Sequence, residues 1–179
     1  MKTITILATL LLCAAAFADN ITQTHEAGVP YVDAGATAVD IYDGDITSRI
    51  VATGSVNWGM LTVSAITYNV TDLSGNAADP AVRTVTVKDT WPPVITLKGP
   101  AEIKVARGYA LEVPGLGATA LDSFSGACTV TATWDKPLIL TKAGIYTVTY
   151  TAKDSSGNVA TPLKQVVKVV GKCLITIRP

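Results

Sequence analysis

The sequence predicts an all-β protein made of two tandem β-sandwich domains that follow a cleaved signal peptide. The first observation is a period of two: in residues 143–154, AGIYTVTYTAKD, large apolar side chains alternate with threonines, as in a half-buried strand. The second is a repeat: YNVTDLSGNAA at 68–78 returns as YTAKDSSGNVA at 150–160, 82 residues further on (150 − 68). The third is the absence of any long amphipathic helical pattern between these segments.

Residues 1–18 have the pattern of a secretory signal. Lys2 precedes an apolar run from residue 4 to residue 17, and small residues at Ala16 and Ala18 predict cleavage after Ala18. The run is shorter than the roughly 20 residues that span a bilayer, so we expect no membrane span. The expected destination is extracellular, with the periplasm as an alternative.

The first domain is predicted to cover residues 19–89. Its elements are GATAVD at 35–40, a turn YDGDIT at 42–47, an alternating strand that leads into 68–78, and a valine-rich strand around residue 86. Tyr68 is expected to face inward before the turn. In that turn a glycine can supply a positive φ, while the aspartate and asparagine side chains bond nearby backbone groups.

The second domain is predicted to cover residues 90–171, after a linker with two prolines. Pro92 and Pro93 exclude a helix and allow an edge strand to begin. This copy opens with PPVITLKGP, whereas the first copy starts at DNITQTHEAG directly after the signal, so we expect domain 1 to lack its first strand.

A strand-like tail, KCLITIRP, follows at residues 172–179. One interpretation is a third repeat that is cut off after its first strand. The other is head-to-tail self-association, in which residues 174–179 of one molecule fill the open sheet edge of domain 1 in another.

These motifs together resemble the immunoglobulin-like repeats of bacterial surface proteins, which also occur in a pesticidal crystal protein and are related to hyalin repeats. The resemblance rests on GATAxD, the acidic glycine turn, GxYxVxYxxxDxxGN and PPVITL, and it covers nearly all of the mature chain. It implies an immunoglobulin-like sandwich in each copy and a role as spacer, adhesive arm or accessory module. Two differences between the copies matter: Ser64 stands opposite Tyr146, and Asp43 and Asp45 stand opposite Ser125 and Ala127.

Three carboxylates in DIYDGDIT raise the question of a metal. Asp40, Asp43 and Asp45 lie within six residues around a glycine turn, and clustered oxygen ligands suit Ca²⁺. The alternative is a solvated turn in which a carboxylate caps backbone N–H groups. The second copy, with Ser125 and Ala127, is expected to bind no metal at that place. No other cofactor is expected.

Two cysteines and two sequons remain in the mature chain. Cys128 and Cys173 are candidates for a disulfide in an oxidising compartment, the alternative being two thiols. Asn20 and Asn69 stand in glycosylation sequons, and Asn69 is expected to face solvent because it alternates with Tyr68.

The tryptophans suggest a ligand surface or packing. Trp58 and Trp134 are candidates for stacking on a sugar, although they do not recur at the repeat offset, which argues against a duplicated sugar site. Trp91, in the linker, is expected to pack between the domains.

Charge and composition exclude several classes of function. Without Lys2 the chain has 13 basic residues (14 − 1) and 14 acidic ones, so no basic surface for nucleic acid is expected. A single histidine argues against zinc-protease and triad chemistry, and we expect no enzyme. The sequence favours a secreted non-catalytic adhesion, spacer or assembly module that binds a cell-surface protein or glycan. A carbohydrate-binding module or a toxin accessory domain is the alternative.

Overall fold

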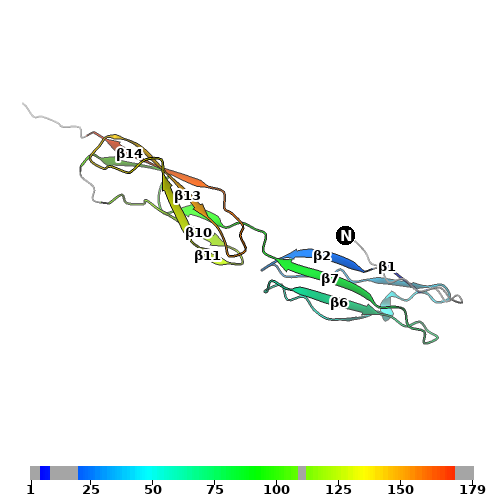
Figure 1. Ribbon diagram of the computed structural model, residues 1–179. Coiled ribbons are helices and arrows are strands. Elements are labelled where there is room, and N and C mark those ends of the chain that lie inside the picture. The colour runs from blue at the N-terminus through cyan, green and yellow to red at the C-terminus, as the bar shows by residue number, and fades with distance from the viewer. Residues whose placement is uncertain (1–4, 9–19, 109–111, 172–179) are drawn as a thin grey trace, which may run out of the picture. The chain divides into compact units, whose positions relative to one another are not determined.

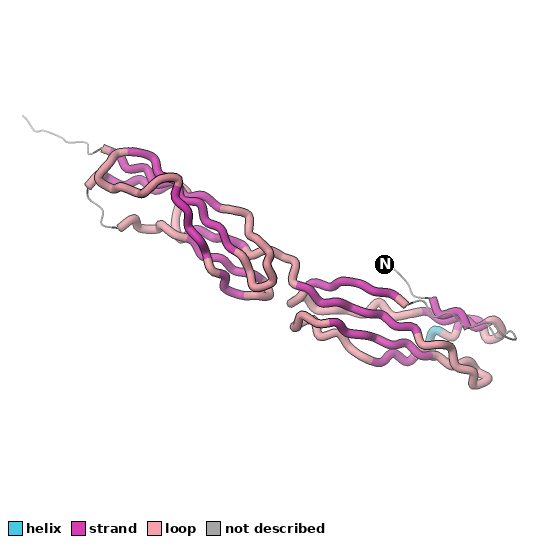
Figure 2. The backbone as a smooth tube through the Cα atoms, viewed as in Figure 1, coloured by secondary structure: helices cyan, strands magenta, loops and turns pink. Residues whose placement is uncertain are grey.

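The computed structural model describes residues 5–8, 20–108 and 112–171, which form two compact units. Unit 1 ends at Asp89 and unit 2 begins at Thr90. Strands and loops make up the described chain, apart from one turn of 3₁₀-helix, η1, at Thr47–Arg49 (Figure 2). No helix in the described part is long and apolar enough to cross a membrane.

Unit 1 has two sheets. The larger sheet has the order β2-β7-β6-β5, and the first three of these strands run side by side in Figure 1. The smaller sheet has the order β1-β3-β4. The strand bounds are Thr5–Ala8 (β1), Ile21–Glu26 (β2), Thr37–Asp40 (β3), Gly44–Asp45 (β4), Val51–Thr53 (β5), Val63–Asn69 (β6) and Ala81–Lys88 (β7).

Unit 2 repeats this plan. Its sheets have the orders β12-β13-β14-β9 and β11-β10-β8. The bounds are Val94–Leu97 (β8), Glu102–Ala106 (β9), Ala118–Asp122 (β10), Gly126–Cys128 (β11), Val130–Trp134 (β12), Gly144–Ala152 (β13) and Leu163–Val170 (β14). At the offset of 82 residues, β6 aligns with β13 and β7 aligns with β14. The all-β repeat expected from the sequence is therefore confirmed.

The alternation in β13 puts its large side chains into the core. Tyr146, Val148 and Tyr150 are buried, while the threonines between them lie half-buried on the other face. In unit 1 the inward Tyr68 is 1% exposed and packs with Ala38, Ile46 and Ile66, residues that come from both sheets or from the loop after β4. Each unit therefore has its own sandwich core, which burial of apolar surface stabilises.

The repeated turn has the expected chemistry. Gly75 has φ +92°, and the Asp72 carboxylate accepts hydrogen bonds from the Asn76 backbone N–H and side-chain amide, both at 2.7 Å. The Asn76 carbonyl in turn accepts a hydrogen bond from the Asp72 N–H at 2.9 Å. The second copy makes the same bonds between Asp154 and Asn158.

The two units differ at the edge of the smaller sheet. In unit 2, β8 pairs with β10 antiparallel, with Val94 opposite Leu121. In unit 1, β1 pairs with β3 in parallel, with Thr5 opposite Thr37. The edge for which we expected no strand is thus occupied by a segment of the predicted signal region, and it runs in the opposite sense to its counterpart in unit 2.

Candidate functional site

Two turns of unit 1 meet at one end of its sandwich. The turn after β3 is shaped by Asp40, which is 4% exposed and whose Oδ1 accepts the N–H groups of Tyr42 and Asp43 at 2.8 and 2.9 Å. Asp43 then reaches across to the turn after β6, where its Oδ2 accepts the Leu73 N–H at 2.8 Å. Carboxylate bonds to backbone N–H groups therefore hold the two turns together.

Asp45 completes this framework at the start of η1. Its Oδ1 accepts the Thr47 N–H at 2.9 Å, and hydrogen bonding to Thr47 lowers the pKa of the Asp45 carboxyl. Thr47 Oγ1 in turn accepts the Ala38 N–H at 3.0 Å, which ties η1 to β3.

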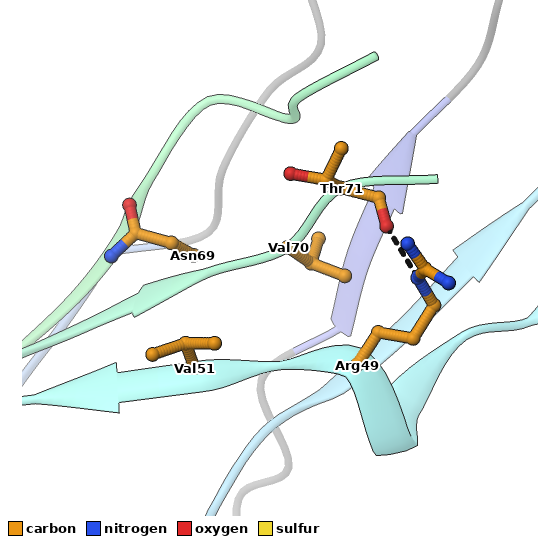
Figure 3. Close-up of a pocket in the computed structure, with 5 residues that line it drawn as sticks. All are labelled: Arg49, Val51, Asn69, Val70 and Thr71. Carbon is orange, nitrogen blue, oxygen red and sulfur yellow. Dashed lines mark hydrogen bonds between the residues drawn. The ribbon is translucent and has the colours of Figure 1, made fainter. Parts of the chain in front are cut away.

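Arg49, at the end of η1, fastens the second turn from the side. Its Nε donates to the Thr71 carbonyl at 2.6 Å and its Nη2 to the Asp72 carbonyl at 3.0 Å. Figure 3 shows the guanidinium bonded to Thr71, and both residues line a pocket together with Val51, Asn69 and Val70. The pocket is open, and its lining offers a cation beside apolar side chains.

The framework leaves three large apolar side chains in solvent, and we call them the unit 1 tip: Ile41, Tyr42 and Leu73, which are 64, 75 and 70% exposed. Their counterparts in unit 2 at the offset of 82 are Ser123, Phe124 and Ser155. There the two turns are joined by a hydrogen bond between the Ser125 and Ser155 hydroxyls at 2.8 Å. Unit 1 thus exposes three large apolar side chains at positions where unit 2 has two serines and a phenylalanine.

The three predicted calcium ligands lie in the turn that carries Ile41 and Tyr42, but their carboxylates accept hydrogen bonds from backbone N–H groups. Asp40, Asp43 and Asp45 each bond a different set of backbone N–H groups. The calcium site at these residues stays a prediction. The apolar tip itself was missed, and the signal that would have found it is the exchange of Ile41 and Leu73 for serines in the second copy.

The predicted sugar-stacking residues have different surroundings. Trp58 is 40% exposed in the loop before β6. Trp134, at the end of β12, packs against the unit 2 core that contains Ile103 and Val105. At the offset of 82, Trp58 corresponds to Leu140, so unit 2 has no aromatic residue at that position.

The remaining candidate residues are placed as follows. Asn69 is exposed, as its alternation with Tyr68 predicts, and Asn20 accepts the Val82 N–H at 2.7 Å. Cys128 is half-buried, with its Sγ 3.4 Å from the Gly126 carbonyl. Cys173 lies outside the described residues, so the disulfide stays a prediction.

Comparison with known families places both copies in one group. The model of a family described as bacterial surface protein, Ig-like domain, matches residues 16–87 and again 95–169. The two matched segments correspond to the two units. No curated protein matches the chain.

Solved structures give only distant likenesses. Human protocadherin-24 EC1-2 is 13% identical, with a TM-score of 0.41, over 85% of this chain and 95% of that one. The fibronectin(III)-like modules of Clostridium thermocellum CbhA are 14% identical, with a TM-score of 0.35, over 88 and 94%. A lipoprotein from Bacteroides thetaiotaomicron is 19% identical, with a TM-score of 0.34, over 83 and 75%. At these scores the likenesses say nothing about a ligand.

Proposed function

Because the chain belongs to the bacterial surface Ig-like family, we propose that it is a secreted, non-catalytic adhesion module that binds a cell-surface partner through the unit 1 tip. Modules of this family serve at the cell surface, and their sandwich supplies a rigid frame rather than reacting groups. Function therefore has to come from a surface that one copy has and the other lacks.

The exposure of Ile41, Tyr42 and Leu73 carries this proposal. Apolar side chains that are more than half exposed, held on turns that hydrogen bonds fix, lose little freedom on binding. Arg49 holds the turn that carries Leu73, through the carbonyls of Thr71 and Asp72. Tyrosine and arginine are both enriched at protein interfaces. A protein surface fits this tip better than a sugar, because two of its three exposed side chains, Ile41 and Leu73, are aliphatic.

The test exchanges the tip for its counterpart in the second copy. The variant Ile41→Ser/Tyr42→Phe/Leu73→Ser carries the unit 2 residues, so the backbone framework of Asp40 and Asp43 is retained. We expect binding of the labelled full chain to intact cells of the encoding bacterium to weaken by about tenfold or more. The control Val32→Ser/Val63→Ser removes two other exposed apolar side chains of unit 1 and should bind as the parent does.

Equal binding by the tip variant and the parent would contradict the proposal. The same would follow if the control lost binding to the same extent, because adhesion would then depend on general hydrophobicity. Circular dichroism of the variants guards against a loss that comes from unfolding.

Export is part of the proposal. Cleavage after Ala18 would give a mature chain that begins at Asp19, and it would remove β1 from the edge of the smaller sheet. N-terminal sequencing of the secreted protein is expected to return DNITQ, and retention of Met1 on the exported protein would contradict it.

Carbohydrate binding is the second candidate function, and the exposure of Trp58 is the observation in its favour. A glycan array would show sugar binding by the parent that Trp58→Ala abolishes. A role as a toxin accessory domain has no observation of its own among the described residues.

Self-assembly through residues 174–179 stays a prediction, because residues 172–179 lie outside the described chain. Deleting them is expected to abolish any oligomer detected by light scattering, and a parent that is monomeric at high concentration would contradict head-to-tail assembly.

A further inference from the structure

Unit 2 contains two buried carboxylates that form no ion pair with the described residues. Asp122 ends β10 and is 4% exposed, and Asp154 opens the turn after β13 and is 8% exposed. A carboxylate oxygen of one lies within 4.8 Å of a carboxylate oxygen of the other. Within residues 112–171 no ion pair reaches either aspartate.

One oxygen of this pair is left without a partner. Asp122 Oδ1 accepts the N–H groups of Phe124 and Ser125 at 2.8 and 2.7 Å, whereas Oδ2 is buried and forms no hydrogen bond. A buried carboxylate oxygen that is neither solvated nor bonded is costly. Because Oδ1 is committed to the turn, Oδ2 is the atom of Asp122 that is available to a ligand.

Unit 1 carries the same pair as Asp40 and Asp72. There Arg49 holds the turn through the main chain, because its Nη2 donates to the Asp72 carbonyl at 3.0 Å. The residue that corresponds to Arg49 in unit 2 is Thr131, in β12, which is exposed and uncharged. The second copy therefore keeps the two acids without the arginine that fastens the turn.

We propose that Asp122 and Asp154 bind a divalent cation of the oxygen-preferring kind, with Ca²⁺ as the matching ion. Both ligands are carboxylates, and neither histidine nor a thiolate is offered by this pair, which disfavours zinc and copper. Asp122 supplies its unbonded Oδ2, and Asp154 supplies a lone pair beside the bonds that it accepts from Gly157 and Asn158. Backbone carbonyls and water complete a Ca²⁺ shell in such sites.

Asp122 corresponds to Asp40, but Asp154 takes the place of Asp43 and Asp45, so this ligand set differs from the one that the sequence suggested. It also departs from the expectation that the second copy binds no metal at that turn. It joins two turns of unit 2 rather than lying in one turn of unit 1. An ion there would link the end of β10, in the smaller sheet, to the turn after β13, in the larger one.

Thermal unfolding of the full chain, stripped with EDTA and then measured with and without about 1 mM Ca²⁺, tests the site. We expect Ca²⁺ to raise the Tm of the parent by about 3 °C or more, because an ion that binds only the folded state stabilises it. Asp122→Asn and Asp154→Asn are expected to lose this shift. Asp40→Asn, the matched change in unit 1, is expected to keep it.

A second measurement keeps the test sharp if either asparagine variant folds poorly. Calorimetric titration of the EDTA-stripped parent and of Asp40→Asn with Ca²⁺ is expected to give the same heat of binding for both, and no heat from the parent would contradict the site. A parent whose Tm does not move with Ca²⁺ would overturn the proposal. So would an Asp122→Asn variant that keeps the shift, or an Asp40→Asn variant that loses it.

Discussion

Arg83 and Asp33, fifty residues apart in sequence, form an ion pair inside unit 1. The guanidinium of Arg83 is 1% exposed, and its Nη1 bonds Asp33 Oδ1 while its Nη2 donates to the Gly35 carbonyl at 2.8 Å. The Tyr68 hydroxyl donates to the same carboxylate at 2.7 Å. Burial is the largest single effect and acts to lower the pKa of Arg83. The charges of Asp33 and Tyr68 and the hydrogen bonds to Asp33 and Tyr31 together outweigh it, so the pKa is raised.

The same place in unit 2 is neutral. Gln165 corresponds to Arg83 and is fully buried, and its Nε2 donates to the carbonyls of Pro100 and Gly115 at 2.9 Å. Tyr150, the counterpart of Tyr68, donates to Gln165 Oε1 at 3.0 Å. In both copies a polar side chain of the last strand holds a loop of the same unit. In unit 1 the charged Arg83 holds the loop before β3, and in unit 2 the amide of Gln165 holds the loop before β10.

Removing Asp33 should leave Arg83 as an uncompensated buried charge. We expect Asp33→Ala to lower the free energy of unfolding by about 3 kcal/mol, at the low end for a broken buried pair because the Asp33 side chain is 29% exposed. Asp33→Ala/Arg83→Gln, which copies the neutral arrangement of unit 2, should recover at least half of that loss in urea denaturation. A double variant no more stable than Asp33→Ala would show that the charge is not the source of the loss.

Acid should weaken the repeated turn of unit 1. The side-chain bond from Asn76 is the main cause that lowers the pKa of Asp72, so the folded state disfavours protonation. A depressed folded pKa gives stability that is present above the unfolded pKa, about 3.9, and is lost as pH falls through the folded value. We expect Asn76→Ala to lower the Tm at pH 6, and the difference from the parent to shrink as pH falls below about 4.

The control for this series is Asn57→Ala, which removes an asparagine whose Oδ1 accepts only the Gly59 N–H in an exposed loop. Its difference from the parent should not change over the same range of pH. A constant Tm difference for Asn76→Ala from pH 6 to pH 3 would contradict the assignment.

Gly75 should tolerate no side chain without strain. Its φ of +92° belongs to the region that L-residues rarely adopt, although nothing within 4 Å would meet a Cβ there. We expect Gly75→Ala to lower the free energy of unfolding by about 1–2 kcal/mol from backbone strain alone. Gly59→Ala, at a glycine without a positive φ, should stay within about 0.5 kcal/mol of the parent in the same measurement.

The two tryptophans should differ in their contribution to stability. Trp134 packs against the unit 2 core, so Trp134→Ala is expected to lower the free energy of unfolding by about 2–3 kcal/mol. Trp58→Ala, at an exposed loop position, should cost less than about 1 kcal/mol. Urea denaturation of both variants checks this, and a Trp58→Ala variant as unstable as Trp134→Ala would contradict a surface role for Trp58.

The sequence predicted what depends on local period and on comparison of the copies. Alternation identified the strand around Tyr146, and the repeat identified the turn of Asp72 and Asn76, because both patterns are contained in a few consecutive residues. The pairing of Arg83 with Asp33 depends on two segments that only the folded chain brings together. The acids at 40, 43 and 45 show the same limit: closeness in sequence does not reveal which N–H group each carboxylate faces.

The first strand of each larger sheet pairs in parallel with the last one, β2 with β7 and β9 with β14. When a unit is pulled at its first and last strands, the force acts along these two paired strands and shears the hydrogen bonds between them. Six residue pairs from Ile21 and Arg83 to Glu26 and Lys88 must then slip together rather than open one by one. Single-molecule stretching is expected to show a high rupture force for each unit, and a chain anchored at one end and attached at the other would carry tension without lengthening.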